Sequence, residues 1–322
     1  MTIKDIVATI KNSFPNISSV YFVGCGASQA DLYVAKYFLI RNAKRLRTDL
    51  ITANEFNYDP PKNLGSESIV VACSLGGTTP ETVAAAKMAR ESGSPVICLT
   101  NDESSPLAQN GDYVIVHGFH ESYSAKMQKL TKALTLAVEI LQQYEGYEDY
   151  ELMLEGTEKI YELIDASIPF VKPLAQKFAL ECKDEPFIYV MGSGPSQMVA
   201  YTFSSFILME MQWINSASFS TGEFFHGPFE LVDRNVPYLL LMNDGNTRYM
   251  DSRALEFLER FGAKTTVVDA KDYGLGSTIS EKVKDYFNPI LIDGILRVYG
   301  EELAKARNHP LTQRRYMWKI HY

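Results

Sequence analysis

The sequence predicts an α/β protein in which two copies of one unit follow each other along the chain. An apolar stretch, a glycine-rich turn and a helical pattern occur at residues 20–39 and again at 188–208. A further apolar stretch leads into a polar turn at 73–82 and again at 241–250. Strand patterns that alternate with helical patterns are typical of a parallel sheet with helices on both faces. We therefore expect two such layered units in tandem.

The two copies are related by a shift of 168 residues. This shift pairs four residues of the glycine-rich turns, Gly24, Gly26, Ser28 and Gln29, with Gly192, Gly194, Ser196 and Gln197. It also pairs Gly77 with Gly245 and Thr79 with Thr247. One residue out of this register, the stretch 91–101 is similar to 260–270. Three features repeated in the same order indicate an internal duplication.

The boundary between the copies is predicted near residues 146–150, after an amphipathic helical pattern and within an acidic, tyrosine-bearing stretch. The first domain is thus 1–148, and the second is 149–322 with a C-terminal tail. We expect the last long helix at 288–307, because Pro289 suits its first turn and the sequence His309-Pro310 ends it.

Composition limits the possible partners. The chain has 322 residues, a formal net charge of −8 and a pI near 5.3, whereas nucleic acids and anionic membrane surfaces attract clustered Lys and Arg. Its longest apolar runs are far shorter than the roughly 20 residues that cross a bilayer, and its start lacks a signal-peptide core. We expect a cytoplasmic protein without nucleic-acid or membrane partners.

Cysteine and histidine spacings do not predict a metal site. The four cysteines contain no CxxC pair and the five histidines no HExxH motif. Small, reduced and buried cysteines are the favoured interpretation. We expect neither a metal nor a cofactor.

The glycine-rich and hydroxyl-rich turns are candidates for a phosphate site. Such a turn before a helix exposes backbone N–H groups at the positive helix end, where anions bind. Each turn alone is more typical of an ordinary N-cap, but two turns at adjacent strand ends favour phosphate. In the second copy, Asn243 and Asp244 make an anion less favourable, so we expect one phosphate site per chain. The candidate contacts are Ser28, Ser74, Leu75, Gly77, Thr78 and Thr79.

Glu210 is an unusual residue within the apolar run SFILMEMQWI. If this run is an α-helix, Glu210 shares a face with four apolar residues, Phe203, Phe206, Trp213 and Ile214. Loss of water costs roughly 2–7 kcal/mol even for a neutral polar group. Burial also raises a carboxyl pKa, which suits a general base. The residues alone leave two alternatives open, a catalytic base and a buried ion pair.

With FVGCGAS, CSLGGTTPET and GEFFHGPFE in this order, the chain resembles the sugar isomerase (SIS) domain superfamily, arranged as a tandem pair. The resemblance covers nearly the whole chain and is most specific at 207–230 and 306–322. It is greatest to the fructosamine 6-phosphate deglycases and extends to the isomerase portion of glucosamine 6-phosphate synthase. It implies two three-layer α/β/α domains, a phosphorylated sugar-amine substrate, and a homo-oligomer, a dimer or larger, whose subunits share an active site.

The resemblance also implies residue roles. Glu210 would move a proton between C1 and C2 of the open-chain sugar, and His226 would assist ring opening and proton shuttling, often from the neighbouring subunit. The Ser74–Thr79 loop would hold the phosphate with Ser28, although Gly76 stands where a second serine is common. Arg315 of the tail would close over the sugar, with Lys319 as a second candidate.

His226 has a structural alternative as well. A lone histidine among aromatic residues is more often a packed core residue, and Glu223 could orient it or simply begin a short helix, which we favour.

The expected function is fructosamine 6-phosphate deglycation. The alternatives are aldose–ketose isomerisation of a phosphosugar and a non-catalytic sugar-phosphate-binding regulator. Amide-dependent amination is disfavoured, because the chain begins MTIKD without the glutamine-hydrolysing domain of the synthase.

Overall fold

The computed structural model describes residues 1–321 and divides into two units, Met1–Glu158 and a second unit from Lys159 onward. The division lies within one helix, α9 (Tyr150–Cys182), ten residues beyond the predicted domain end at 148. At the predicted boundary, residues 146–149 precede this helix, and the acidic stretch from Tyr150 onward forms its first turns. Each unit is therefore described by itself.

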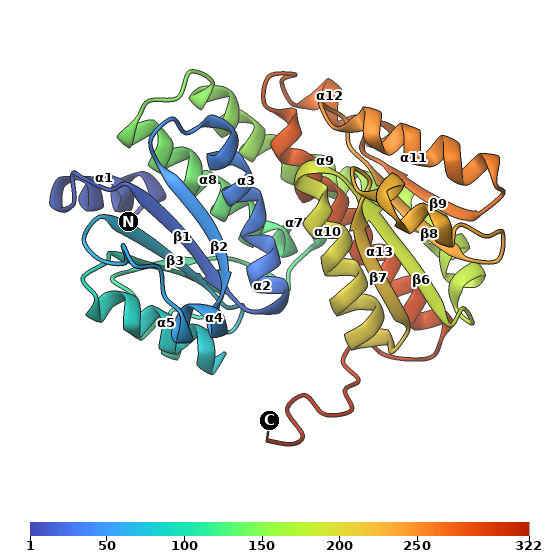
Figure 1. The fold of residues 1–322 in the computed structure, drawn as a ribbon, viewed down its shortest axis with the longest axis horizontal. Helices are drawn as coiled ribbons and strands as arrows, with labels where there is room; N and C mark the ends of the chain where they lie inside the picture. Colours follow the sequence, from blue (N-terminus) through green and yellow to red (C-terminus); the bar gives the residue numbers. More distant parts are fainter. Residues whose placement is uncertain (322) are drawn as a thin grey trace. The chain divides into compact units, whose positions relative to one another are not determined.

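The first unit contains a five-stranded sheet in which all strands are parallel, in the order β2-β1-β3-β4-β5 (Figure 1). The strands are β1 (Ser19–Gly24), β2 (Arg47–Thr52), β3 (Ser68–Cys73), β4 (Val96–Thr100) and β5 (Tyr113–Val116). All residues of β1 and β3 are buried, because helices cover both faces of the sheet. Gly24 pairs with Cys73, so the turns after these two strands begin at the same level.

Helices α1, α3 and α8 pack together on one side of this sheet, and α4 and α5 lie on the other (Figure 1). On the α4 and α5 side, Tyr21 and Val23 of β1 contact Phe56 and Ala85 in one apolar cluster. The helices of this unit are α1 (Ile3–Ser13), α2 (Gly26–Asp31), α3 (Tyr33–Asn42), α4 (Ala53–Tyr58), α5 (Pro80–Glu91), α6 (Pro106–Asn110), α7 (Tyr123–Lys126) and α8 (Gln128–Tyr144).

The second unit repeats the first four strands in the order β7-β6-β8-β9, again all parallel. Its strands are β6 (Phe187–Gly192), β7 (Asn215–Ser220), β8 (Pro237–Met242) and β9 (Lys264–Asp269). Strands β6 and β7 lie 168 residues after β1 and β2, which is the shift found in the sequence. The predicted fold class, two tandem α/β units with parallel sheets, is confirmed.

Helix α11 covers one face of the second sheet, where Leu240 and Met242 pack against Ala254 and Leu258. The long helix α13 is buried along most of its length and contacts α10. The remaining elements are η1 (Gly194–Ser196), α10 (Gln197–Thr202), η2 (Phe203–Met211), η3 (Phe224–His226), η4 (Pro228–Leu231), α11 (Arg248–Arg260), η5 (Ala270–Tyr273), α12 (Leu275–Thr278), η6 (Lys284–Phe287) and α13 (Asn288–Ala306). Among the described residues, no helix combines the length and apolar character needed to cross a membrane.

All four cysteines are free, as predicted. Cys73, Cys98 and Cys182 are buried, and burial raises the pKa of each thiol to about 12. Cys25 is only partly buried. The three buried residues therefore act as small apolar side chains.

Candidate functional site

Glu210 lies in η2, and this element is a π-helix rather than the expected α-helix. A π-helix bonds each residue to the fifth one along, and this one ends at Met211, so Trp213 and Ile214 lie beyond it. The chain then leaves the helix, and Trp213 adopts a φ of 56°, which is rare for a bulky residue. The predicted α-helical face through Trp213 and Ile214 is therefore wrong. π-Helical turns and strained residues of this kind are common at functional sites.

Contacts from the chain segment after α13 hold the backbone at Gln212 and Trp213. The side-chain amide of Gln212 donates to the carbonyl of His309 at 2.8 Å. The ring of His309 packs edge-on against Trp213, with 4.4 Å between ring centres. The Arg307 guanidinium donates to the carbonyl of Gln212 at 3.4 Å. Trp213 is therefore fixed in an otherwise unfavourable conformation.

The Glu210 carboxylate forms an ion pair with Arg314, with 2.8 Å between Oε1 and Nη2. The Glu210 side chain is 22% exposed and that of Arg314 is 8% exposed. Burial raises the pKa of Glu210 above its ordinary value, and the Arg314 guanidinium offsets only part of that rise. The structure thus agrees with both alternatives, a catalytic base and a buried ion pair, because the Glu210 carboxylate is paired and its pKa is still raised.

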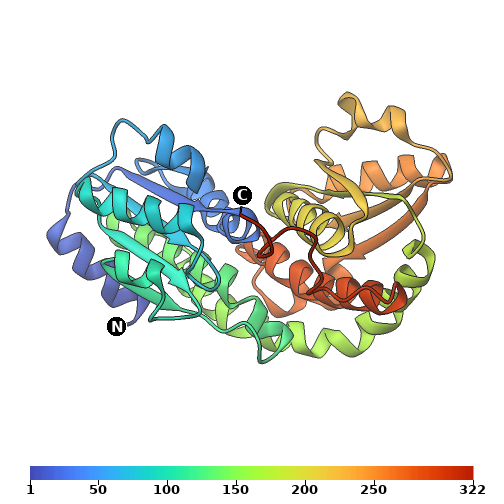
Figure 2. The same ribbon diagram turned by 90° about the horizontal axis from the view of Figure 1, so that it is seen from below.

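A pocket of about 550 Å³ lies beside Glu210 within the second unit. This volume is in the range of small-molecule sites. Figure 2 shows the C-terminal segment, in dark red, running beside the yellow helical coil that includes η2. The lining residues are Met209, Glu210, Trp213, Ile214, Asn215, Arg314, Arg315, Tyr316 and Met317.

The tail therefore contributes two guanidinium groups to this pocket. Arg315, which the resemblance selected, lines the pocket with its guanidinium carbon 4.1 Å from the centre of the Trp213 ring. Arg314 was missed, although it is the residue that pairs with Glu210. The adjacent arginines in QRRY indicated a cation here, but the choice between them depends on tertiary contacts. Lys319 does not line the pocket and instead donates to the carbonyl of Arg314.

His226 ends the short helix η3 and is exposed. Its backbone N–H donates to the carbonyl of Glu223 at 2.9 Å, and Glu223 lies directly before this helix. The interpretation of His226 as a packed core residue is wrong; the buried residue here is Phe224. Within one chain, His226 does not line the pocket beside Glu210. Its catalytic role stays a prediction.

The turn after β3 is rigidly held. The carbonyl of Leu75 accepts hydrogen bonds from the Thr100 hydroxyl at 3.0 Å and from the N–H of Asn101 at 2.8 Å. Gly77 has a φ of 65°, and a Cβ there would lie 2.1 Å from the Ser105 Oγ. Only glycine fits this position without strain.

Helix α5 begins directly after this turn. Thr79 is its N-cap, but the Thr79 hydroxyl lies 2.9 Å from the Ser74 hydroxyl and makes no capping bond to the helix. The first-turn N–H groups of α5 thus lack a side-chain acceptor. Thr78 is exposed next to them. This turn has the features of an anion site.

Ser28 lies in α2, after the neighbouring strand β1. Lys129 of α8 donates to the Ser28 hydroxyl at 3.2 Å and pairs with Asp31 at 2.7 Å. Both charged side chains are buried. Sequence reasoning missed this buried ion pair, because its members are far apart along the chain.

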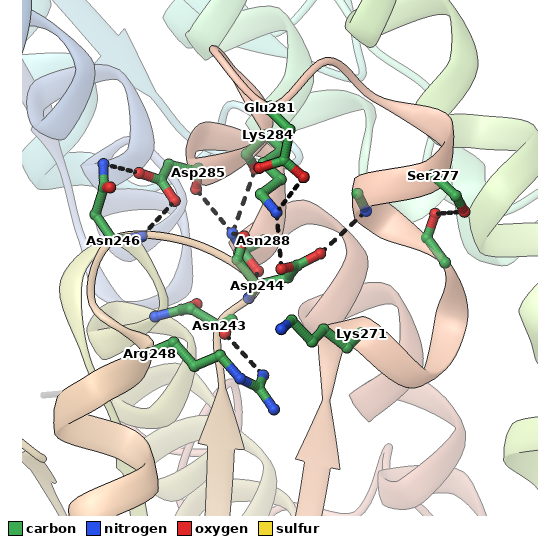
Figure 3. Close-up of polar contacts among 12 residues, drawn as sticks. Asn243, Asp244, Asn246, Arg248, Lys271, Ser277, Glu281, Lys284, Asp285 and Asn288 are labelled. Atoms are coloured by element: carbon green, nitrogen blue, oxygen red, sulfur yellow. Dashed lines mark hydrogen bonds and ion pairs between the residues drawn. The ribbon is translucent and has the colours of Figure 1, made fainter.

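In the second unit, the equivalent turn is filled by carboxylates of the chain itself (Figure 3). Asp285 accepts from the N–H of Asn246 at 3.0 Å, and a Cβ at Gly245 would lie 1.4 Å from the same carboxylate oxygen. Asp244 pairs with Lys284 at 2.8 Å and accepts from the N–H of Gly276 at 3.1 Å. This arrangement supports the prediction of one phosphate site per chain. Among residues 1–321, no group of three or more His, Cys, Asp or Glu side chains is placed to hold a metal ion.

Known proteins are similar to this chain in sequence and in fold. The SIS domain model matches residues 14–144. The fructosamine deglycase FrlB of Bacillus subtilis is 40% identical over 306 residues, which cover 95% of this chain and 93% of that protein. The chain belongs to the SIS domain family. The fructoselysine 6-phosphate deglycase of Escherichia coli K12 is 22% identical over 94% of this chain and 86% of its own length.

The fold of this SIS protein matches solved structures over its full length. A Salmonella typhimurium LT2 protein assigned as a phosphosugar isomerase has a TM-score of 0.96 and 42% identity, covering 99% of this chain and 96% of its own. Two of the relatives named here are deglycases and the third is assigned as a phosphosugar isomerase, and this SIS protein is an enzyme as well. The alternative of a non-catalytic regulator is therefore wrong.

Proposed function

We propose that this SIS protein is a fructosamine 6-phosphate deglycase, which hydrolyses a fructosyl-amino acid 6-phosphate to glucose 6-phosphate and the free amino acid. The observation that carries the proposal is Glu210, a partly buried carboxylate with a raised pKa beside a pocket of about 550 Å³. The 40% identity to a fructosamine deglycase supports this reaction.

The reaction requires one proton transfer and one hydrolysis. Glu210 removes a proton from C1, which carries the amine, and the C2 carbonyl takes up a proton to give an enaminol. Return of a proton to C2 leaves an imine between C1 and the amine nitrogen. Water adds to C1, the C–N bond breaks, and glucose 6-phosphate and the amine are released. General acid–base catalysis of this kind needs a base whose pKa lies near the working pH.

The other candidate residues have separate roles in this proposal. The turn with Ser74, Leu75, Gly77, Thr78 and Thr79 holds the phosphate, aided by Ser28. His226 assists ring opening and proton transfer at the active site of a neighbouring subunit in a homo-oligomer, which agrees with its exposure within one chain. We place the enzyme in the cytoplasm, where its free cysteines stay reduced.

Aldose–ketose isomerisation of a phosphosugar is the second candidate. It uses the same glutamate, and the assignment of the Salmonella typhimurium protein as a phosphosugar isomerase favours it. It forms no imine and releases no amine.

The two candidates are separated by incubating the enzyme with fructosyl-lysine 6-phosphate and, in parallel, with fructose 6-phosphate and glucose 6-phosphate. A deglycase releases glucose 6-phosphate and an equal amount of lysine from the first compound, detected by a coupled dehydrogenase assay and amino-acid analysis. Interconversion of the plain hexose phosphates without amine release from the first compound would instead establish the isomerase.

A further inference from the structure

We propose that Arg315 binds the carboxylate of the substrate's amino-acid portion and so makes the enzyme selective for sugar-amino acid adducts over sugar-amine adducts. This inference rests on the proposed deglycase function, and it assigns Arg315 a different ligand from the sugar ring that the family resemblance suggested.

The chemistry of the substrate places this carboxylate near Glu210. In a fructosyl α-amino acid, only the nitrogen and the α-carbon separate C1 from the carboxyl carbon. Because Glu210 removes the proton from C1, the α-carboxylate must lie in the same pocket. The phosphate is at the other end of the sugar, six carbons along the chain. A second negative charge therefore enters the pocket that already holds the Glu210 carboxylate.

The pocket contains one cation for each of these two carboxylates. Arg314 is already engaged, because its Nη2 pairs with Glu210 and its Nη1 donates to the carbonyls of Leu311 at 2.7 Å and Gln313 at 2.9 Å. A charge brought into a partly buried apolar pocket needs a partner of opposite sign. Among the lining residues, the remaining cation is Arg315.

Arg315 has the geometry that a carboxylate requires. Its side chain is exposed and makes no ion pair or hydrogen bond with the other described residues. Its guanidinium carbon lies over the Trp213 ring, 4.1 Å from the ring centre, and such a contact restrains the guanidinium while its N–H groups stay available. Trp213 is itself held at a φ of 56° by Gln212 and His309, so it is a rigid support. Two parallel N–H groups of such a guanidinium match a carboxylate.

Two substrates that differ only at this group test the inference. Fructosyl-glycine 6-phosphate carries the carboxylate, and fructosyl-glycinamide 6-phosphate has a neutral amide of nearly the same shape. The wild-type enzyme should prefer the glycine compound at least tenfold in kcat/KM. Arg315→Gln should reduce this preference to about one, mainly through a higher KM for the glycine compound, and Arg315→Lys should keep part of it. The matched control is Arg260→Gln, because Arg260 lies over the Phe261 ring at 5.4 Å but outside the pocket; it should keep the full preference.

Three outcomes would overturn the inference. Equal turnover of the two compounds by the wild-type enzyme shows that the carboxylate is not recognised. An equal loss of kcat/KM for both compounds in Arg315→Gln shows that Arg315 contacts the sugar or the phosphate. If Arg315→Gln keeps the full preference, another group binds the carboxylate. A different result would contradict the proposed function itself: release of glucose 6-phosphate from neither compound by the wild-type enzyme.

Discussion

Glu210 and Arg314 illustrate how two opposing effects set the proton affinity of one side chain. Burial among apolar residues disfavours the charged carboxylate, whereas the guanidinium at 2.8 Å favours it. Burial is the larger effect, so the pKa of Glu210 stays above its ordinary value. A carboxylate without Arg314 would be a stronger base but would be protonated over more of the acidic range.

The pH dependence of catalysis follows from this balance. The base acts only when deprotonated, so kcat/KM should fall as the pH drops through the raised pKa of Glu210, above the ordinary glutamate value of about 4.3. Arg314→Leu removes the effect that lowers this pKa, so the acidic limb of the kcat/KM profile should move to higher pH. An unmoved limb, or one at lower pH, would show that Arg314 does not control the base. Arg260→Leu, outside the pocket, serves as the control.

The turn after β3 contains two neighbouring glycines, Gly76 and Gly77, that differ in their surroundings. Gly77 is fixed by its positive φ and by Ser105, whereas Gly76 is exposed and a Cβ there would have no neighbour within 4 Å. The two glycines of one turn thus have different tolerances to substitution.

Substitution of these glycines should have contrasting effects. Gly77→Ala should lower the free energy of unfolding by roughly 1–3 kcal/mol, because the methyl group overlaps Ser105 and the backbone is strained. Gly76→Ser should leave stability unchanged and, by adding a hydroxyl, strengthen phosphate binding. Thermal unfolding with and without glucose 6-phosphate measures both effects. A Gly77→Ala variant as stable as the wild type would show that the backbone conformation of Gly77 is not required.

The equivalent turn of the second unit should gain an anion site when its own carboxylate is removed. In Asp285→Ala, the N–H of Asn246, two residues before α11 begins, loses its acceptor, and inorganic phosphate can take the place of the carboxylate. Calorimetry should detect one more phosphate site in Asp285→Ala than in the wild type, and no additional site in Asp285→Asn, whose amide fills the turn. No additional site in the alanine variant would mean that Asp285 does not occupy an anion position.

Sequence patterns predicted the elements better than their contacts. The apolar runs and the 168-residue shift predicted β1 with β6 and β3 with β8, because strand burial is a local property. The edge strands β2 and β7 were not predicted, because they are polar and little buried. The π-helical winding around Glu210 was not predicted, since apolar periodicity does not distinguish a π-turn within a short apolar run. The pairing of Glu210 with Arg314 rather than Arg315 was also not predicted. This pairing depends on contacts between the tail and the chain around Gln212, and these segments are about a hundred positions apart in the sequence.

At the level of the whole molecule, the proposed function gives the two halves of the duplicated chain different tasks. In this proposal the first half holds the phosphate at the turn after β3. The second half has its own equivalent turn filled by Asp285 and carries Glu210, His226 and the tail arginines. If His226 acts at the active site of a neighbouring subunit, the working unit of the enzyme is at least a dimer, and neither subunit alone contains all the proposed catalytic groups.

Mixed oligomers test this sharing. Glu210→Gln and His226→Ala should each be inactive alone, but equal mixing with subunit exchange should restore roughly a quarter of the wild-type kcat. Half of the dimers then contain both variants, and each of these has one intact site out of two. Continued inactivity after exchange, with mixed dimers confirmed by native mass spectrometry, would place His226 and Glu210 at the same subunit's site.

Glucose 6-phosphate release by Glu210→Gln from a fructosyl-amino acid 6-phosphate tests the proposed chemistry most directly. The amide keeps an acceptor for Arg314, so the thermal midpoint and KM should change little. Loss of the base should lower kcat by roughly 10²–10⁴-fold, the usual contribution of general acid–base catalysis. A folded Glu210→Gln variant that turns over at nearly the wild-type rate would contradict the assignment of Glu210 as the base.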